Sequence, residues 1–190
     1  MIRLPAGLFR IMRNRIDLWG RDEFTMADYL RKQGVQIGEN CRIFISDVGT
    51  EPYLIKIGNH CTITIGVQFI VHDGGCSLFR HELPDLNYFG KIEIEDNCFI
   101  GINAIILPNV KIGRNSIVGS GAVVAKDIPP NSVAVGVPAR VIGTVEEYKN
   151  KMVAEWKKLN LRGERREWKA QLIQHFWGDS YAVEMKRRQR

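Results

Sequence analysis

The sequence predicts an all-β solenoid, a parallel β-helix built from six-residue repeats. Bulky apolar residues recur at every sixth position through the middle of the 190-residue chain. Six is neither the helical period nor the two-residue alternation of an ordinary strand, and hexapeptide repeats are typical of β-helices. We therefore expect each short strand to point one of these residues at a shared core. The series is Ile37, Ile43, then Ile57, Ile63, Phe69, then Ile94, Ile100, Ile106, Ile112, Val118 and Val124.

A second position of the repeat supports this interpretation. Small residues follow most anchors by four positions, as expected where a tight corner turns its side chain inward: Cys41, Cys61, Cys98, Ala104, Val110, Ser116 and Ala122. Glycine, asparagine and aspartate fill the corners, and these types suit left-handed or self-bonded turns. Three of the four cysteines thus serve as core residues, and Cys76 is an incidental loop thiol. No paired Cys motif exists, which favours a reducing, cytoplasmic compartment and argues against a zinc site.

Helical segments flank the predicted solenoid. We expect residues 1–34 to form an N-terminal helical segment, with a capping-box-like start at Thr25, a helix through Lys32 and a stop at Gly34. The solenoid should span residues 35–143, interrupted at 46–54 and by a longer inserted loop at 74–91. Its last part, 132–142, should be extended. Residues 144–190 then show a helical period that Gly163 divides into two helices, followed by a basic tail.

Charge is concentrated in the flanks. Residues 1–34 carry a net charge of +3, residues 35–143 of −2 and residues 144–190 of +5. The pattern favours solvated helix faces, with weak contact to an anionic membrane surface as the alternative. No apolar run has the roughly twenty residues that cross a bilayer, and residues 1–20 lack a secretory signal pattern. Nucleic-acid binding would rest on charge alone, without a motif.

Two segments resemble a known family. The stretch 119–142 (GSGAVVAKDIPPNSVAVGVPARVI) closely resembles the end of the β-helix in hexapeptide-repeat acyltransferases. Residues 49–58 (GTEPYLIKIG) and 69–75 (FIVHDGG) look like the branch that acetylates surface polysaccharides. The resemblance implies a left-handed helix, a homotrimer, acetyl-CoA as the acyl donor, no metal and a carbohydrate acceptor. It covers roughly residues 35–143 and leaves both flanks outside.

Acetyl transfer from a thioester to a hydroxyl requires a base, an oxyanion donor and aligned substrates. His72 matches the family's catalytic histidine, and a neutral imidazole suits a base near pH 7. A hydrogen bond at its other ring nitrogen should orient it. Glu51 and Asp73 are the leading candidates, with Asp47 or a backbone carbonyl as alternatives. Without the resemblance, His72 would be interpreted as an exposed loop histidine.

The resemblance also implies residues that hold the cofactor. Gly101 and Ser120 match positions where backbone groups face the pantetheine arm, although corner geometry alone also explains them. Lys126 matches a lysine near the nucleotide phosphates, and Arg140 stands where a basic residue reaches the adenosine. For Lys126 the competing interpretation is a solvated turn charge.

Two other functions remain open at this point, and a third is disfavoured. N-acetylation of an amino group on a nucleotide sugar uses the same fold and donor. A non-catalytic solenoid scaffold would not need a histidine before an aromatic-rich insertion. A γ-type carbonic anhydrase needs three zinc-binding histidines, and His60, His72 and His81 do not reproduce that spacing. The inserted loop should select the acceptor, which its composition does not identify.

Overall fold

The computed structural model describes residues 20–188, and for residues 179–188 it describes the backbone alone. Residues 1–19 of the predicted N-terminal helical segment and the last two residues of the basic tail lie outside this range. The chain divides into two compact units after Val145, which are treated separately below. None of the described helices combines the length and apolar character needed to cross a membrane.

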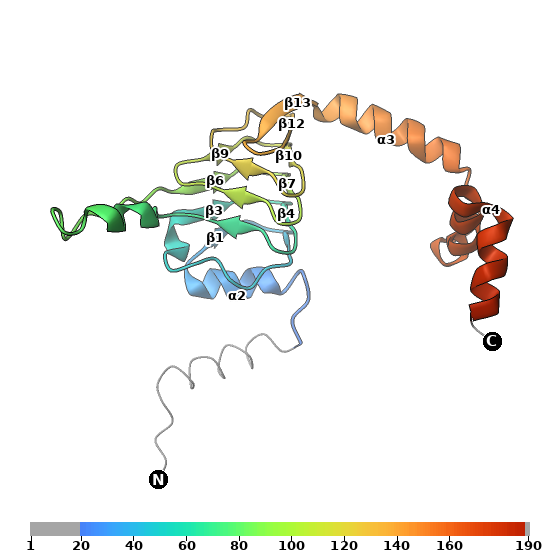
Figure 1. Cartoon of the computed structure of the whole chain (residues 1–190), viewed down its shortest axis with the longest axis horizontal. Helices are drawn as coiled ribbons and strands as arrows, with labels where there is room; N and C mark the ends of the chain where they lie inside the picture. The colour runs from blue at the N-terminus through green and yellow to red at the C-terminus, as the bar shows by residue number, and fades with distance from the viewer. Residues whose placement is uncertain (1–19, 189–190) are drawn as a thin grey trace, which may run out of the picture. The chain divides into compact units, whose positions relative to one another are not determined.

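Short strands form three sheets in the first unit, which we name A, B and C (Figure 1). Sheet A contains β1 (Gln36–Ile37), β3 (Ile55–Ile57), β6 (Ile92–Ile94) and β9 (Lys111–Ile112). Sheet B contains β2 (Arg42–Ile43), β4 (Thr62–Ile63), β7 (Phe99–Ile100), β10 (Ile117–Val118), β12 (Ser132–Val135) and β13 (Arg140–Thr144). Sheet C contains β5 (Gln68–Phe69), β8 (Ile105–Ile106) and β11 (Val123–Val124).

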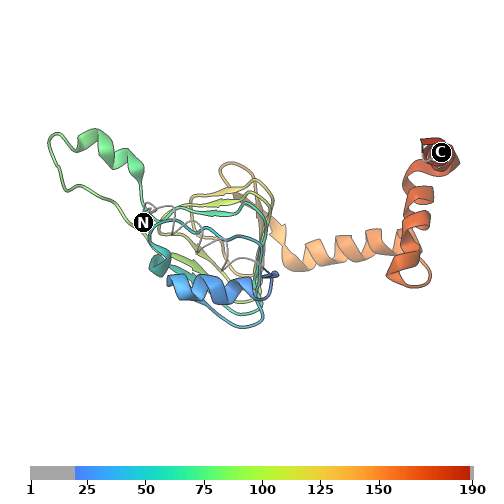
Figure 2. The same cartoon turned by 90° about the horizontal axis from the view of Figure 1, so that it is seen from below.

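From β3 to β11 the chain visits sheets A, B and C in turn, and each strand pairs in parallel with a strand one coil away. Viewed along the stack in Figure 2, successive coils overlay one another, and the inserted loop projects away from them. The parallel sheets and the flanking helices confirm the coarse prediction. The left hand of the helix stays a prediction.

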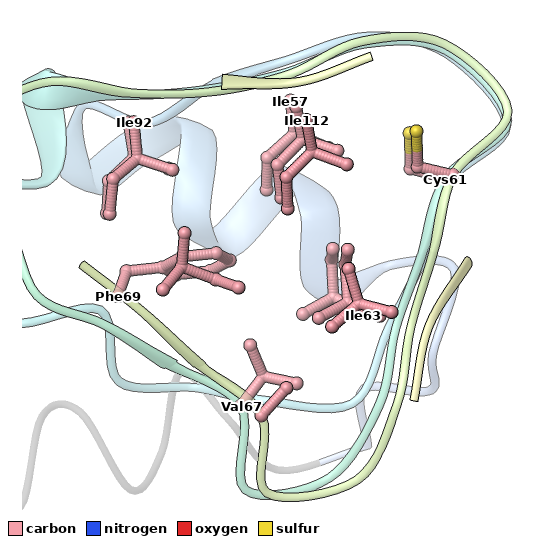
Figure 3. Close-up of a cluster of buried hydrophobic side chains, with 14 of the residues drawn as sticks. Ile57, Cys61, Ile63, Val67, Phe69, Ile92 and Ile112 are labelled. Carbon is pink, nitrogen blue, oxygen red and sulfur yellow. The ribbon is translucent and has the colours of Figure 1, made fainter. Parts of the chain in front are cut away.

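Stacked apolar residues fill the interior, as the six-residue series predicts. Ile57, Ile94 and Ile112 stand in register in sheet A, and all three are buried. Sheets B and C contribute similar ladders, Ile43–Ile63–Ile100–Val118 and Phe69–Ile106–Val124, and Figure 3 shows members of all three around one core. Ile37, in the first coil, is only half-buried. The small inward residues are buried as well.

Left-handed residues mark the corner that leads from sheet A to sheet B. Asn40, His60, Asn97, Asn115 and Asn131 occupy equivalent positions there, and each has a φ between 54° and 59°. The side chains of the last three stack, so that the Asn97 amide donates to Asn115 Oδ1 and the Asn115 amide donates to Asn131 Oδ1, both at 3.0 Å. These bonds satisfy polar side-chain groups at the last three of these corners and favour Asn there.

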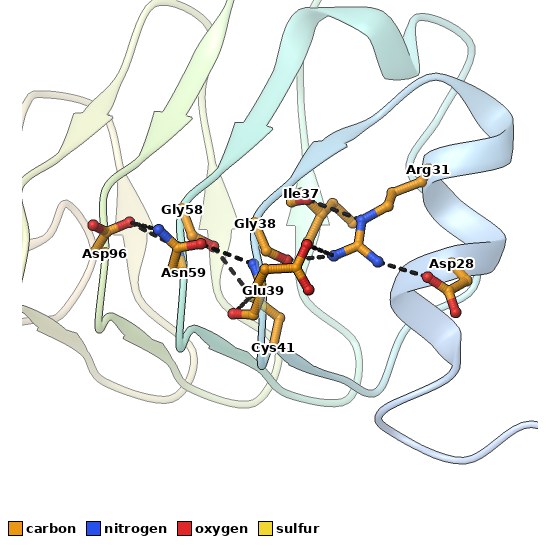
Figure 4. A network of polar contacts seen from close by, with 9 residues as sticks. All are labelled: Asp28, Arg31, Ile37, Gly38, Glu39, Cys41, Gly58, Asn59 and Asp96. Atoms are coloured by element: carbon orange, nitrogen blue, oxygen red, sulfur yellow. Dashed lines mark hydrogen bonds and ion pairs between the residues drawn. The ribbon is translucent and has the colours of Figure 1, made fainter.

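Helix α2 (Met26–Gln33) covers the first coil with three buried residues, Ala27, Tyr29 and Leu30. Figure 4 shows Arg31 joining Asp28, at 2.6 Å, to the backbone oxygens of Ile37, at 2.9 Å, and Gly38. The predicted stop at Gly34 is confirmed, with φ 112° and its N–H bonded to Arg31 and Leu30 carbonyls.

The predicted capping role of Thr25 is wrong. Thr25 is itself helical and makes no side-chain cap bond. Its hydroxyl instead donates to Asp22 Oδ1 at 2.8 Å, and the same oxygen accepts from the N–H groups of Phe24 and Thr25 at 3.1 and 2.9 Å. Asp22 thus fixes the turn that precedes the helix, and Thr25 makes no side-chain bond to the free N–H groups of the first helical turn.

The segment 132–142 is a hairpin rather than one extended strand. Strand β12 continues sheet B in parallel with β10, and β13 then returns antiparallel to β12. The chain reverses between Val135 and Arg140, where Gly136 adopts φ 95°. An antiparallel pair thus ends the stack of parallel coils.

The second unit contains two helices, as the helical period predicts. They are α3 (Val145–Leu159) and α4 (Trp168–Arg188), preceded by the 3-10 turn η3 (Arg165–Glu167). Helix α4 is kinked at Gly178, where φ is 67° and ψ is −174°. Trp156 packs edge-on against Trp168 at 5.2 Å between ring centroids.

Candidate active site

His72 lies just after β5, at the point where the inserted loop leaves sheet C. Its backbone forms an antiparallel bridge with Phe89 at the other end of the loop. The Asp73 N–H donates to the Tyr88 carbonyl at 3.0 Å, and the Gly90 N–H donates to the Val71 carbonyl at 2.8 Å. The loop is therefore closed at its base, and this pairing holds His72 on the rigid coil below.

Glu51 is the acidic residue that contacts the His72 ring. His72 Nδ1 lies 2.9 Å from Glu51 Oε2, and the two side chains are 48% and 16% exposed. Hydrogen bonds from Thr50 and His72 hold the pKa of Glu51 below its usual value, so the carboxylate is ionised near neutral pH. An ionised carboxylate can only accept hydrogen bonds, so the His72 nitrogen that faces it, Nδ1, must carry a proton. In the neutral ring the lone pair is then on Nε2. That is the form a general base requires.

The other acidic candidates have different partners. Asp73 Oδ1 accepts from the Gly75 N–H at 2.8 Å and begins the 3-10 helix η2 (Gly74–Phe79) in the loop. Asp47 Oδ1 accepts from the Gly49 N–H at 3.0 Å. Glu51 reaches His72 because it comes from the first interruption, immediately before the 3-10 turn η1 (Pro52–Leu54). Both interruptions of the solenoid thus meet at this site.

Two loop aromatics stand beside His72, and sequence reasoning did not single them out. The Phe89 ring meets the His72 ring edge to face, with 6.3 Å between centroids and 68° between planes. The Asn109 amide donates to the Tyr88 hydroxyl at 2.8 Å, tying the loop to the next coil. Phe89 remains 51% exposed. The sequence shows that the loop is rich in aromatic residues. Only the backbone bridge between His72 and Phe89 shows which of them lies next to the histidine.

Gly101 and Ser120 lie at the corner between sheets B and C. The Gly101 N–H donates to the Val118 carbonyl at 2.8 Å, and a Cβ at position 101 would lie 2.5 Å from the Ser120 nitrogen. Stacking of the coils therefore requires glycine at 101 for steric reasons alone. Ser120 is exposed. The corner-geometry explanation of Gly101 holds, and it is compatible with a ligand lying along this corner.

Lys126 and Arg140 occupy other parts of the solenoid. Both side chains are exposed. The register of sheet C aligns Lys126 with Val71, next to His72 but two coils further on. Arg140 begins β13 in sheet B and donates to the Ala139 carbonyl at 2.9 Å. Within one chain, His72 and Lys126 thus share the corner after sheet C, while Gly101 and Ser120 share the corner before it.

The remaining histidines are not gathered into a metal site. His60 occupies a left-handed corner with φ 54°, and His81 pairs with Glu82 in the loop at 3.1 Å. Across the part of the chain that the structure describes, no three His, Cys, Asp or Glu side chains are arranged to hold a metal ion. Cys41, Cys61 and Cys98 are buried free thiols, as expected from their place in the repeat.

These features define a hexapeptide-repeat β-helix with a histidine–carboxylate pair at the base of an inserted loop. Comparison with known proteins agrees with this class. The family model described as bacterial transferase hexapeptide (six repeats) matches residues 91–126. Protein CapG of Staphylococcus aureus is 48% identical over 139 residues, covering 70% of this chain and 81% of that protein. The galactoside O-acetyltransferase of Lactococcus lactis is 31% identical over 157 residues, covering 70% and 74%.

Solved structures show the same fold. A hexapeptide-repeat acetyltransferase from Vibrio cholerae superimposes with a TM-score of 0.57 at 23% identity, over 72% of this chain and 89% of that one. The same enzyme in complex with acetyl coenzyme A gives a TM-score of 0.53 at 21% identity, over 73% and 89%. The chain belongs to the family of bacterial hexapeptide-repeat transferases.

Proposed function

We propose that the protein transfers an acetyl group from acetyl-CoA to a hydroxyl group of a sugar, in a surface polysaccharide or its precursor. The observation that carries this proposal is the His72–Glu51 pair, because it leaves Nε2 as an exposed base at the edge of the solenoid. Galactoside O-acetyltransferase among the relatives supports a sugar hydroxyl as the acceptor. The acetyl coenzyme A complex of the Vibrio cholerae enzyme supports the donor.

The reaction follows from this geometry. His72 Nε2 takes the proton of the acceptor hydroxyl while its oxygen attacks the thioester carbonyl. The negative charge that develops on the carbonyl oxygen needs a hydrogen-bond donor. As the tetrahedral intermediate collapses, the carbon–sulfur bond breaks and the imidazolium returns the proton to the departing thiolate. Glu51 stabilises the transient positive charge on His72 and keeps its ring in place.

We infer that the complete site forms between copies in a homotrimer. Within one chain, the two corners proposed to serve the donor lie on opposite edges of sheet C. A neighbouring copy would bring its Gly101 corner to the His72 corner of the first, with Lys126 and Arg140 contributing positive charge for the CoA phosphates. Apolar residues exposed around the Gly101 corner support such a contact, because burying them would stabilise assembly. They are Ile65, Phe99, Ile102 and Val137.

The acceptor should lie over the loop aromatics. Phe89 presents an exposed ring beside His72, and the apolar face of a sugar ring packs well on an aromatic surface. The loop residues 74–91 then form one wall of the acceptor site, and the proposed catalytic domain is the solenoid 35–143.

An acceptor screen tests the proposal. Purified protein is incubated with acetyl-CoA and matched sugars that carry either free hydroxyls only or an amino group. Release of free CoA thiol is followed, and mass spectrometry locates the acetyl group. Thiol release with hydroxyl sugars and an ester product supports the proposal. An amide product with amino sugars alone would instead identify an N-acetyltransferase, and no turnover with any acceptor would favour a scaffold.

A further inference from the structure

The second unit has an apolar surface that its own described residues leave exposed. No side chain of residues 146–178 is buried, although the two helices carry several large apolar residues. Met152, Trp156 and Leu159 of α3 and Phe176 of α4 line a hollow of about 620 Å³, which we call the C-terminal hollow. Phe176 is 62% exposed and Trp156 is 50% exposed. Exposed apolar patches of this kind mark interaction surfaces.

Hydrogen bonds of polar groups nonetheless stabilise the connection between the two helices. The side-chain amide of Gln171 bridges the connection, donating to the Arg162 carbonyl at 2.8 Å and accepting from the Arg162 N–H at 3.0 Å. The Trp168 indole donates to the Gly163 carbonyl at 3.2 Å. Glu164 and Glu167 form a reciprocal capping box before α4. These hydrogen bonds stabilise the connection between α3 and α4. The two helices therefore present their aromatic side chains on an ordered backbone rather than in an irregular segment.

The helical unit carries an excess of positive charge, although the two charged residues that line the hollow, Glu155 and Lys158, pair with each other at 2.7 Å. Residues 146–178 contain eight Lys or Arg against five Asp or Glu, a net charge of +3. Lys157 and Lys169 are exposed on α3 and α4, and Arg165 and Arg166 are exposed in the turn between them. Apolar aromatic residues combined with Lys and Arg characterise helices that lie in the interface of an anionic bilayer.

We propose that the C-terminal helical unit docks on an anionic lipid surface, with the rim of the C-terminal hollow inserted among the lipid headgroups. Trp and Tyr favour that boundary, where one end of the side chain is apolar and the other hydrated. The sequence alone gave membrane contact as an alternative for the basic flanks in general, and the proposal assigns it to α3 and α4. It does not depend on the acyl transfer, because lipid binding is measured without substrate.

A second copy of the same unit fits this surface less well than a lipid bilayer does. Both units would carry a net charge of +3, so their association would bring like charges together around an apolar centre. An anionic surface instead complements both features at once, the charge through Lys and Arg and the apolar rim through the acyl chains.

Vesicle co-sedimentation of the full chain tests the proposal. Anionic phosphatidylglycerol vesicles and neutral phosphatidylcholine vesicles are compared at low and high salt. The charge variant is Lys157→Glu with Lys169→Glu, and the apolar variant is Met152→Ala with Phe176→Ala. The matched control is Lys32→Glu with Arg80→Glu, which makes the same charge change in the first unit. Circular dichroism verifies that helix content is retained.

The parent should bind anionic vesicles at low salt and lose binding at high salt. The charge variant should bind at least roughly tenfold more weakly, because each basic residue near an anionic surface changes affinity severalfold. The apolar variant should weaken similarly, while the control binds like the parent. If the parent protein does not co-sediment with anionic vesicles at low salt, the proposal is wrong. It is also wrong if all variants bind equally, or if light scattering shows self-association through the hollow in place of lipid binding.

Discussion

Truncation of one core isoleucine provides a quantitative test of the six-residue register. Ile57 is 2% exposed and stands between Ile37 and Ile94 in sheet A. Replacing it with alanine removes buried methylene groups and leaves a cavity that stacked coils relieve only in part. We expect Ile57→Ala to lower the free energy of unfolding by about 3 kcal/mol, within the range for buried Ile→Ala changes. For a chain of this size, that corresponds to a fall in Tm of roughly 6 to 12 °C.

The neighbouring residue on the same strand is the matched control. Lys56 is exposed on the outer face of β3, so Lys56→Ala should change Tm by no more than roughly 2 °C. Differential scanning calorimetry on both variants gives the comparison. If Ile57→Ala melts like Lys56→Ala, the inward and outward positions of the repeat have been misassigned and the register is wrong.

Three further predictions concern the site. Glu51→Gln should reduce kcat roughly 10- to 100-fold with little change in the KM for acetyl-CoA, whereas Asp73→Asn should stay close to the parent. The pKa of Glu51 is lower in the folded protein than in the unfolded chain. The ionised Glu51 carboxylate therefore stabilises the fold fully at pH values above its ordinary pKa, and this stabilisation is lost as the pH falls through the lowered pKa. The Tm difference between parent and Glu51→Gln should therefore hold near pH 6 and disappear well below pH 4.5. Phe89→Ala should raise the KM for the sugar several-fold more than that for acetyl-CoA, and equal effects on both would contradict acceptor stacking.

The sequence predicted the stacked parallel strands well because a bulky aliphatic residue recurs once per strand. Ile94 to Val124 obey the period without a break, and a parallel stack is the simplest way to bury such a series. The same local reasoning found α2 and its stop at Gly34. It missed the role of Asp22, because Thr25 and Asp22 are both good capping residues and only their backbone angles decide between them.

The site was predicted less completely, because its contacts join distant parts of the chain. Glu51 and His72 are 21 residues apart, and they meet only because η1 and the base of the inserted loop lie at the same corner. Sequence spacing therefore left Glu51, Asp73 and Asp47 as alternatives. The hairpin of β12 and β13 shows the same limit: residues 132–142 are mostly apolar, and the reversal depends on the turn at Gly136.

Activity of His72→Ala is the most direct test of the central claim. His72 is half-exposed and its removal leaves the stacked core intact, so the variant should fold and assemble like the parent. With the best acceptor from the screen, CoA thiol release should fall roughly 10²-fold or more, the usual contribution of a general base. Binding of acetyl-CoA, measured by calorimetry, should be unchanged. A variant that turns over like the parent would show that His72 is not the base.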